Sequence, residues 1–354
     1  MRRAPHSPRL LNTHDSRGTA APHQRRADRA HPVEHPAGVR PRPYAERVTD
    51  RLMLLDTASL YFRAFYGVPD KVRAPNGMSV NAARGLLDII AKLVSMYQPT
   101  HVVACWDDDW RPQWRVDLIP SYKAHRVVEV IDAGPDVEEV PDPLEQQIPL
   151  IREALGAIGI PIIGVAEHEA DDVIGTLATR STIPVDIVTG DRDLFQLIDD
   201  ARDVRVVYTA RGMSNLEVLT DASVVGKYGI LPSQYADFAT MRGDASDGLP
   251  GVKGIGEKTA ATLLQTHGDL DAIRAAAAEG DGMSAAASAR FADAAAYLDV
   301  APTVVRVATE LDITPPNAPL LPLDPAQADA ANALAEQWNL GTSMTRAIAA
   351  IDGR

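Results

Sequence analysis

Two short acidic runs decide the fold of this chain: EADD at residues 169–172 and DRD at residues 191–193. Each run follows an apolar segment of strand length, at residues 160–165 and 185–190, and each leads into a helical pattern. The chain therefore uses the same order of strand, acids and helix twice. If both strands lie parallel in one sheet, the two acidic runs lie together at the carboxyl ends of the strands, where α/β folds bind their ligands.

The two runs supply five carboxylates, which are Glu169, Asp171, Asp172, Asp191 and Asp193. In so small a space these groups would repel one another and could not all ionise unless cations held them there. Oxygen ligands with no nearby Cys or His pair favour magnesium or manganese over zinc. The plainer alternative is that the acids are solvated and stabilise the first turns of two helices. Because the two runs have matching contexts, the metal hypothesis is favoured.

Two further segments repeat this pattern. LMLLD at residues 52–56 is an apolar strand that ends in Asp56, and VVACW at residues 102–106 leads into three aspartates at residues 107–109. Up to residue 208, the element order is then β-α-β, a long insert, and α-β-α-β-α-β. This order predicts an α/β domain built around a mostly parallel, doubly wound sheet.

Composition limits the class of protein. The chain has 354 residues, enough for two domains, and a hydrophobic share of 45% supports a substantial core. No apolar run approaches the roughly 20 residues that cross a bilayer. One cysteine, Cys105, excludes an internal disulfide and a multi-thiolate metal site, so we expect a reducing compartment. The net charge of −13 does not exclude nucleic acid, because acids that bind metals count in full and a local basic strip can still bind phosphates.

Three stretches differ from the α/β pattern. Residues 1–50 hold ten Arg, no Lys and seven Pro, a composition that predicts a disordered tail. Residues 110–140 mix cations with aromatic side chains, which suits either a nucleic-acid strand or a solvated charged loop, and both interpretations stay open. Beyond Gly212 helices dominate, with a possible closing strand at residues 303–313 and a last helix at residues 326–338.

The run GVKGIGEKTA at residues 251–260 is typical of a helix-hairpin-helix element, which binds the DNA backbone without reading sequence. Its glycines allow tight turns, and the helix that follows offers free N–H groups to a phosphate. A P-loop is the competing interpretation, but its G-x-x-x-x-G-K-[ST] spacing is absent. The candidate DNA-binding residues are Gly251, Val252, Lys253, Gly254, Ile255, Gly256, Lys258 and Thr259.

Three motifs together resemble those of the 5′ nuclease superfamily, which includes the 5′→3′ exonuclease domain of bacterial DNA polymerase I, stand-alone 5′ exonucleases and flap endonucleases. They are EADDVIGTLA at 169–178, TGDRDLFQL at 189–197 and GDASDGLPGVKGIGEKTA at 243–260, in the order and spacing of the family. The resemblance covers roughly residues 52–315 and is to the stand-alone form. It implies a PIN-like α/β fold with a helical helix-hairpin-helix subdomain.

Composition and the resemblance together predict four parts, although the family does not explain the N-terminal tail. They are a disordered tail at 1–50, an α/β nuclease domain at 51–212 with an arch insert at 110–145, a helical DNA-binding subdomain at 213–315, and a C-terminal linker and helix at 316–354.

The resemblance also implies a site for two Mg²⁺ or Mn²⁺ ions. Its ligands would be Asp56, Asp107, Glu169, Asp171, Asp172, Asp191, Asp193, Asp244 and Asp247. Counting from the second strand gives Asp107, whereas counting back from Trp114 gives Asp108, and we favour Asp107 because strand register fixes what reaches the site. The helix-hairpin-helix can also hold a potassium ion through backbone carbonyls at 251–256.

Residues of the insert complete the implied site. Lys123 and Arg126 would orient and polarise the phosphate, and Tyr122 would stack on a terminal base. Gly248 stands where Asn is common in the family, with no consequence for metal binding evident from the sequence.

The implied activity is hydrolysis of DNA phosphodiester bonds by a structure-specific 5′→3′ exonuclease or 5′-flap endonuclease of replication and repair, including Okazaki fragment processing. We expect a monomer that acts on 5′ ends, flaps and nicked or gapped duplex, in the cytoplasm at the nucleoid and without a membrane, with contact to a DNA polymerase or ligase left open. One alternative is a non-catalytic structure-specific DNA-binding protein, which should have lost acids. The other is an RNA-directed PIN-like nuclease, which should lack the helix-hairpin-helix.

Overall fold

The computed structural model describes residues 50–131, 136–314, 316 and 319–353. The expected disordered tail therefore lies outside the described residues, apart from Asp50. The folded part is one compact unit, Thr49–Arg354. No helix in the described ranges is both long enough and apolar enough to cross a membrane.

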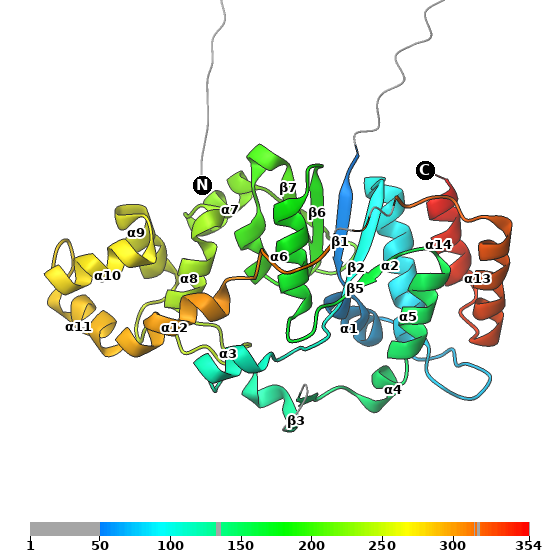
Figure 1. Cartoon of the computed structure of the whole chain (residues 1–354), viewed down its shortest axis with the longest axis horizontal. Helices are drawn as coiled ribbons and strands as arrows, with labels where there is room; N and C mark the ends of the chain where they lie inside the picture. The colour runs from blue at the N-terminus through cyan, green and yellow to red at the C-terminus, as the bar shows by residue number, and fades with distance from the viewer. Residues whose placement is uncertain (1–49, 132–135, 315, 317–318, 354) are drawn as a thin grey trace, which may run out of the picture. The chain divides into compact units, whose positions relative to one another are not determined.

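A six-stranded sheet organises the fold, in the order β5-β2-β1-β6-β7-β8 (Figure 1). Five strands are parallel: β1 Leu52–Asp56, β2 His101–Cys105, β5 Ile162–Ile163, β6 Val185–Thr189 and β7 Val204–Tyr208. The edge strand β8, Glu217–Leu219, runs antiparallel to β7. The predicted mostly parallel, doubly wound α/β sheet is confirmed.

Apolar side chains of the strands alternate between two cores, because successive residues of a strand point to opposite faces. Met53 and Leu55 pack on the face covered by the helices α1 Thr57–Gly67, α2 Asn81–Tyr97, α5 Ile148–Ala157, α13 Pro325–Gln337 and α14 Thr342–Asp352. Leu54 packs on the other face, against α6, Ala170–Arg180. Every residue of β6 is buried, as expected for a central strand covered on both faces.

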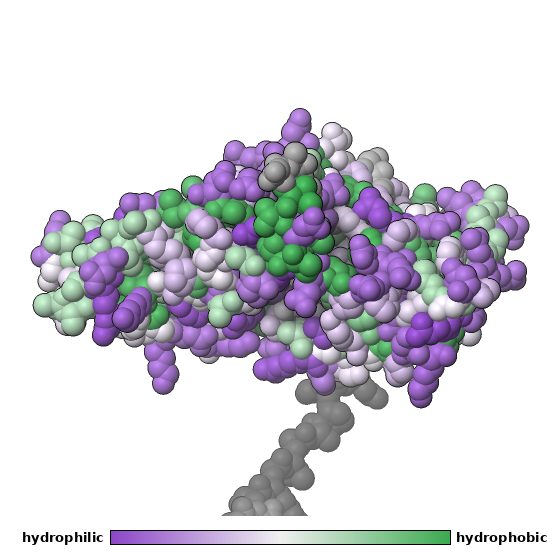
Figure 2. Space-filling view, turned by 90° about the horizontal axis from the view of Figure 1, so that it is seen from below, coloured by the Kyte–Doolittle hydropathy of each residue, from purple (hydrophilic) through white to green (hydrophobic). Residues whose placement is uncertain are grey.

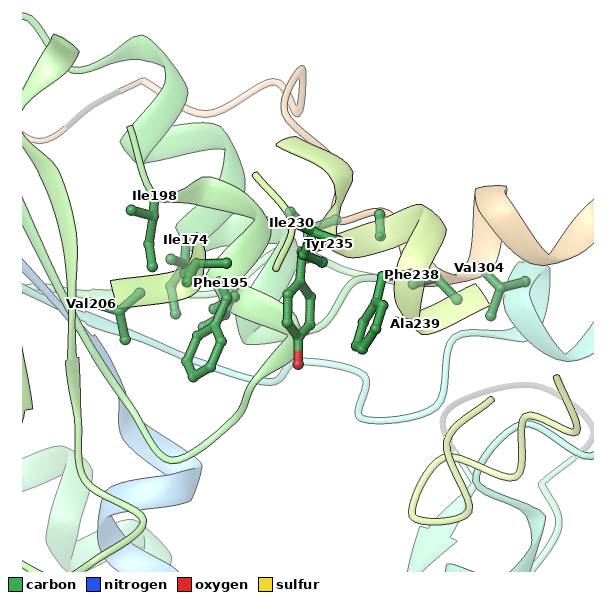
Figure 3. Packing of buried hydrophobic residues seen from close by; sticks show 14 of the residues in the cluster. Ile174, Phe195, Ile198, Val206, Ile230, Tyr235, Phe238, Ala239 and Val304 are labelled. Carbon is green, nitrogen blue, oxygen red and sulfur yellow. The ribbon is translucent and has the colours of Figure 1, made fainter. Parts of the chain in front are cut away.

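The second core continues without a break into the helical part of the chain. This part contains α7 Asp221–Tyr228, α8 Tyr235–Arg242, α9 Glu257–His267, α10 Leu270–Glu279, α11 Ala285–Asp293 and α12 Ala295–Val305. Phe195, after β6, lies between Val206 of the sheet and Tyr235 of α8 (Figure 3). Its ring centroid is 5.4 Å from that of Tyr235 in an edge-on arrangement. One core therefore serves both parts, and the boundary expected near residue 212 stays a prediction.

The insert between β2 and α5 consists of short elements at the carboxyl ends of the strands. They are α3 Gln113–Leu118, a 3-10 turn at Ala124–Arg126, the hairpin strands β3 Val127–Glu129 and β4 Val137–Glu138, and α4 Asp142–Glu145. Figure 2 views this end and shows a hydrophobic patch in the middle of the face. Exposed apolar side chains of the insert are Val128, Val130, Ile131 and Val137.

Four details differ from the sequence predictions. A strand, β8, follows residue 212, and it is only three residues long. The strand predicted at 303–313 is instead the end of α12 and a loop, because Val304 and Val305 pack into the shared core from a helix. The predicted last helix is α13, but a further helix, α14, follows it and packs on α2. The helix expected after Asp193 is a 3-10 turn at Asp193–Leu197.

Candidate active site

A cavity of about 260 Å³ opens where the carboxyl ends of β1, β2 and β6 meet the start of α6. Five of the predicted metal ligands line it: Asp56, Asp107, Glu169, Asp171 and Asp191. Lys123 and Arg126 of the insert line the same cavity. The structure thus brings the acids of four separate segments and two cations to one place, at the lower ends of the strands in Figure 1.

Local structure orients the acids at the strand ends. Thr189 Oγ1, at the end of β6, donates a 2.6 Å hydrogen bond to Asp56 Oδ2, and the backbone N–H of Ser59 donates to Oδ1 at 3.2 Å. The N–H of Ala170, at the start of α6, donates to Asp107 Oδ1 at 2.7 Å. Asp107 therefore faces the cavity, whereas Asp108 is exposed and does not line it. Parallel pairing explains the convergence, since it aligns the strand ends.

The cavity disfavours the ionised form of several acids. Burial, followed by repulsion from Asp107 and Asp191, raises the pKa of Asp56 to about 7 even though Thr189 opposes the shift. Burial also raises the pKa of Asp107 to about 6. The pKa of Asp171 is raised well above its ordinary value by burial and by the charges of Asp191 and Asp56. A bound cation would remove this cost.

Carboxylate oxygens are the ligands that hard divalent ions prefer, so this donor set fits Mg²⁺ or Mn²⁺. The raised pKa values point the same way, because acids forced together without compensation hold their protons. Within the described residues, no three His, Cys, Asp or Glu side chains form a group that could hold one ion. The acids therefore share a cavity without forming a complete coordination sphere.

Asp172, a predicted metal ligand, is paired with an arginine. Its side chain is fully buried and paired with Arg115, whose Nη1 and Nη2 lie 2.8 Å and 2.7 Å from the two carboxylate oxygens. Burial alone would raise the pKa of Asp172, but the charge and hydrogen bonds of Arg115 lower it. Asp172 is thus neutralised by Arg115 and does not line the cavity, so its assignment as a metal ligand stays a prediction.

Glu169 receives three donors from the insert. Lys123 Nζ pairs with Oε1, while Tyr122 Oη and Arg115 Nη1 donate to Oε2 at 2.7 Å and 2.6 Å. Tyr122 is only 4% exposed and belongs to the hydrophobic core. The predicted stacking of Tyr122 on a base is therefore wrong, because the ring has no free face and its hydroxyl is occupied.

Besides Asp172, three predicted ligands lie outside the cavity lining: Asp193, Asp244 and Asp247. Burial and the charges of Asp191 and Asp247 raise the pKa of Asp193 well above its ordinary value, so it lies within electrostatic reach of the cavity acids. Arg126 Nη2 is 3.1 Å from Asp247 Oδ1, and Arg242 Nη2 is 3.0 Å from Asp244 Oδ2. Asp244 and Asp247 are thus paired with arginines.

The insert is fastened to the loop that carries Asp247. Ser121 Oγ donates to the carbonyl of Gly248 at 2.7 Å, and the N–H of Lys123 donates to the carbonyl of Asp247 at 3.0 Å. Gly248 has φ +70°, and a Cβ placed on it would lie 2.0 Å from the carbonyl oxygen of Ser121. Glycine at this position therefore has a consequence that the sequence did not reveal: it allows the close contact that positions Lys123.

The predicted helix-hairpin-helix forms between α8 and α9. Gly251 has φ +66°, and a Cβ there would lie 2.5 Å from the backbone N of Gly243, so both glycines are needed for this approach of two chain segments. Lys253 and Lys258 are exposed, as are Gly254, Gly256 and Thr259. Val252 and Ile255 are 2% and 3% exposed, so their side chains anchor the loop in the core and only their backbones could meet DNA.

The structure adds several residues to the site that were not predicted from the sequence. Trp110 and Glu138 line the cavity, and Arg115 holds two of the acids. Arg115 and Trp110 belong to the stretch of mixed cations and aromatics, which was the available signal. No local pattern pointed to Glu138.

Family models match most of the folded chain. The 5′-3′ exonuclease N-terminal resolvase-like domain matches residues 51–229, and the 5′-3′ exonuclease C-terminal SAM fold matches residues 230–328.

Similar proteins bear the same description. A 5′-3′ exonuclease of Streptomyces coelicolor is 57% identical over 83% of this chain and 98% of its own length. A 5′-3′ exonuclease of Mycobacterium tuberculosis is 48% identical over 85% of this chain and 98% of its own length. DNA polymerase I of Mycobacterium bovis is 41% identical over 65% of this chain, which corresponds to 24% of the polymerase.

Solved structures share the fold at low identity. A T5 5′-exonuclease with bound zinc has a TM-score of 0.57 at 16% identity, over 85% of this chain and all of that one. The catalytic core of Rad2 in complex with a DNA substrate has a TM-score of 0.53 at 17% identity, over 85% of this chain and 91% of that one. With both domain models matched in order and a 57% identical relative covered almost end to end, the chain belongs to the 5′-3′ exonuclease family.

Proposed function

We propose that this protein is a structure-specific 5′→3′ DNA exonuclease and 5′-flap endonuclease that hydrolyses phosphodiester bonds with two divalent ions, Mg²⁺ or Mn²⁺. One observation carries the proposal: five predicted metal ligands, the further acid Glu138 and two cations line a single cavity at the carboxyl ends of parallel strands. The carboxylates would bind the divalent ions, and Lys123 and Arg126 would bind the phosphate.

The cavity acids Asp56, Asp107, Glu169, Asp171 and Asp191 would hold the ions, with Asp193 next to them. Bound divalent ions supply an activated water and stabilise charge on the phosphate and the leaving 3′ oxygen. Among the protein groups, Lys123 and Arg126 orient the scissile phosphate. Glu169 and Asp247, their ion-pair partners, fix both side chains at the cavity wall.

The helix-hairpin-helix would bind the duplex at a distance from the cut. Exposed Lys253 and Lys258 flank a turn whose cap, Gly256, leaves the first N–H groups of α9 without a side-chain partner. These groups suit the phosphates of one strand. Carbonyls within 251–256 would hold a potassium ion between the loop and the DNA.

The arrangement supports a division into a catalytic part at 51–212, with its insert at 110–145, a duplex-binding part at 213–315, and a C-terminal part at 316–354. Substrates would be 5′ ends, flaps and nicked or gapped duplex in replication and repair, including Okazaki fragments. The protein would act as a monomer at the nucleoid in the cytoplasm, with a DNA polymerase or ligase as a possible neighbour on the same DNA.

The test uses a 5′-flap duplex and a blunt duplex, each incubated with Mg²⁺, Mn²⁺ or EDTA. We expect metal-dependent cleavage that leaves a 5′-phosphate on the shortened strand, and no cleavage in EDTA. Binding without cleavage under every metal condition would instead support a non-catalytic DNA-binding protein. Preference for an RNA flap over a DNA flap would support the PIN-like RNA nuclease.

A further inference from the structure

Trp110 lies in the wall between two adjoining cavities. One is the 260 Å³ catalytic cavity, and the other is a groove of about 950 Å³ beneath the insert. Asp107 and Glu138 also line both, so the two spaces meet along this side chain. Trp110 is half-buried, which leaves part of the ring accessible.

Other aromatic side chains near the catalytic cavity are less suited to meet a nucleobase. Tyr122 is buried and bonded to Glu169, and Tyr61 and Trp106 are 8% and 7% exposed. Phe62 lines the catalytic cavity from α1. Of the two rings that line the catalytic cavity, Phe62 and Trp110, Trp110 is the one that belongs to the insert, which also carries Lys123 and Arg126.

Hydrogen bonds fix the position of Trp110. Its indole N–H donates to the backbone carbonyl of Asp136 at 2.7 Å, and its own carbonyl accepts from Lys123 Nζ at 3.4 Å. The carboxylate of Asp136 in turn pairs with buried Arg111. A ring held in this way loses little freedom when a flat ligand stacks on it.

We propose that Trp110 is the stacking platform for a nucleobase next to the scissile phosphate. The inference rests on the proposed nuclease function and names a residue that determines how the strand is positioned. Lys123 contacts both Trp110 and Glu169, so the cation for the phosphate and the platform for the base are set at a fixed spacing. Every base has a π face, so the contact does not depend on sequence.

The charge of the neighbouring groove indicates which side of Trp110 the strand occupies. Its acids include Asp136, Glu138, Glu139, Asp142 and Glu145. These carboxylates would repel phosphates that entered the groove. The catalytic cavity also has acids, but Lys123 and Arg126 line it and do not line the groove, so the strand is placed on the catalytic side of Trp110.

The first experiment measures kcat/KM on a 5′-flap substrate for wild type, Trp110→Ala and Trp110→Phe. An abasic residue replaces, one at a time, each nucleotide flanking the scissile bond. Loss of one stacked base corresponds to about 5- to 150-fold in kcat/KM. We expect Trp110→Ala to show such a loss on the intact substrate and Trp110→Phe to restore most of it. With the abasic residue at the position of the stacked base, the kcat/KM of wild type should fall by a similar factor. The kcat/KM of Trp110→Ala should not fall further, because its stacking contact is already lost.

Trp338→Ala is the matched control, because Trp338 is also half-buried but lies at the end of α13, outside both cavities. In Trp338→Ala, the abasic substitution should lower kcat/KM by the same factor as in wild type. An unaltered kcat/KM in Trp110→Ala, or an equal loss on intact and abasic substrates at both positions, would overturn the proposal.

A second measurement separates this inference from the proposed function. The base that stacks is replaced by 2-aminopurine, and its fluorescence is recorded with DNA bound in EDTA. Quenching in wild type that Trp110→Ala abolishes supports the platform even if the protein proves unable to cleave. If wild type cleaves but both proteins give equal 2-aminopurine fluorescence, the stacking role of Trp110 is contradicted and the nuclease assignment is not.

Discussion

Arg115 binds Asp172 through both guanidinium nitrogens, at 2.8 Å and 2.7 Å, and neither residue is more than 2% exposed. The backbone N–H of Ala308 donates to the same carboxylate at 2.8 Å. Asp172 thus connects the insert, α6 and the segment after α12. Its neighbour Asp171 faces the cavity and has a raised pKa, so adjacent acids have opposite roles.

Amide substitution should separate these two roles. Asp172→Asn removes one of the two carboxylates that hold buried Arg115 and leaves only Glu169 of this pair, so we expect a loss of about 1 to 3 kcal/mol in the free energy of unfolding. Asp171→Asn removes a buried repulsive charge, so the metal-free protein should be at least as stable as wild type while cleavage is abolished. Urea unfolding in EDTA and cleavage in Mg²⁺ check both. Full cleavage by Asp171→Asn would contradict its assignment as a metal ligand.

Removal of metal should make stability fall with rising pH. Folded Asp56 and Asp107 have pKa values of about 7 and 6 against an ordinary value of 3.8, so the folded state holds more protons between about pH 4 and pH 7. Stability then decreases as pH rises through this window. We expect the Tm in EDTA to fall from pH 5 to pH 8 and Mg²⁺ to restore it at pH 8. A Tm in EDTA that rises over this range would argue against the buried cluster.

Lys123→Ala should slow the cleavage step more than it weakens DNA binding. Lys123 lines the cavity, where in the proposed reaction a cation would act on charge that develops at the phosphate. One lost electrostatic contact of this kind costs about 100-fold or more in the rate. Single-turnover rates at saturating enzyme, set beside the Kd for uncleaved flap in EDTA, measure the two effects separately. Equal losses in both would mean that Lys123 only binds.

Gly248→Ala should displace the insert from the loop that carries Asp247. The new Cβ would lie 2.0 Å from the carbonyl oxygen of Ser121, at φ +70°. We expect a loss of more than about 2 kcal/mol in the free energy of unfolding and reduced cleavage. Gly226→Ala in α7 is the control, since nothing lies within 4 Å of its Cβ and the change should gain about 0.5 to 1 kcal/mol. Equal stabilities would refute the close contact.

Lys253→Glu should weaken duplex binding and reduce its salt dependence. Lys253 is exposed at the hairpin, so its contact with a phosphate would release one counterion, and its loss should lower the slope of log Kd against log salt by about 1. Titrations of uncleaved duplex in EDTA at several salt concentrations give the slope. Arg152→Glu on α5 makes the same change in net charge and should leave the slope intact.

The sheet and five cavity acids could be predicted because their signals are local. A buried strand followed by an acid fixes both the element and the end at which Asp56 or Asp191 lies. The different environments of Asp171 and Asp172 could not be predicted from the sequence. Adjacent helical residues point in different directions, and the partner of Asp172 comes from the insert. The burial of Tyr122 could not be predicted either, because it depends on tertiary packing.

Elements at the edges of the fold were harder to predict. Strand β8 has three residues and pairs on one side only, so its sequence carries little alternation. Helix α14 has few large apolar residues, so its sequence gives a weak helical pattern, and its position is fixed by packing on α2.

The uninterrupted core around Phe195 has a consequence for how this protein would choose where to cut. Because this core packs the sheet directly against the hairpin helices, we expect the distance from the bound duplex to the acids to vary little. The protein would then cleave the bond at a fixed distance from the duplex junction. Cavity-forming substitutions at Phe195 or Tyr235 should make the product lengths more heterogeneous before they abolish hydrolysis.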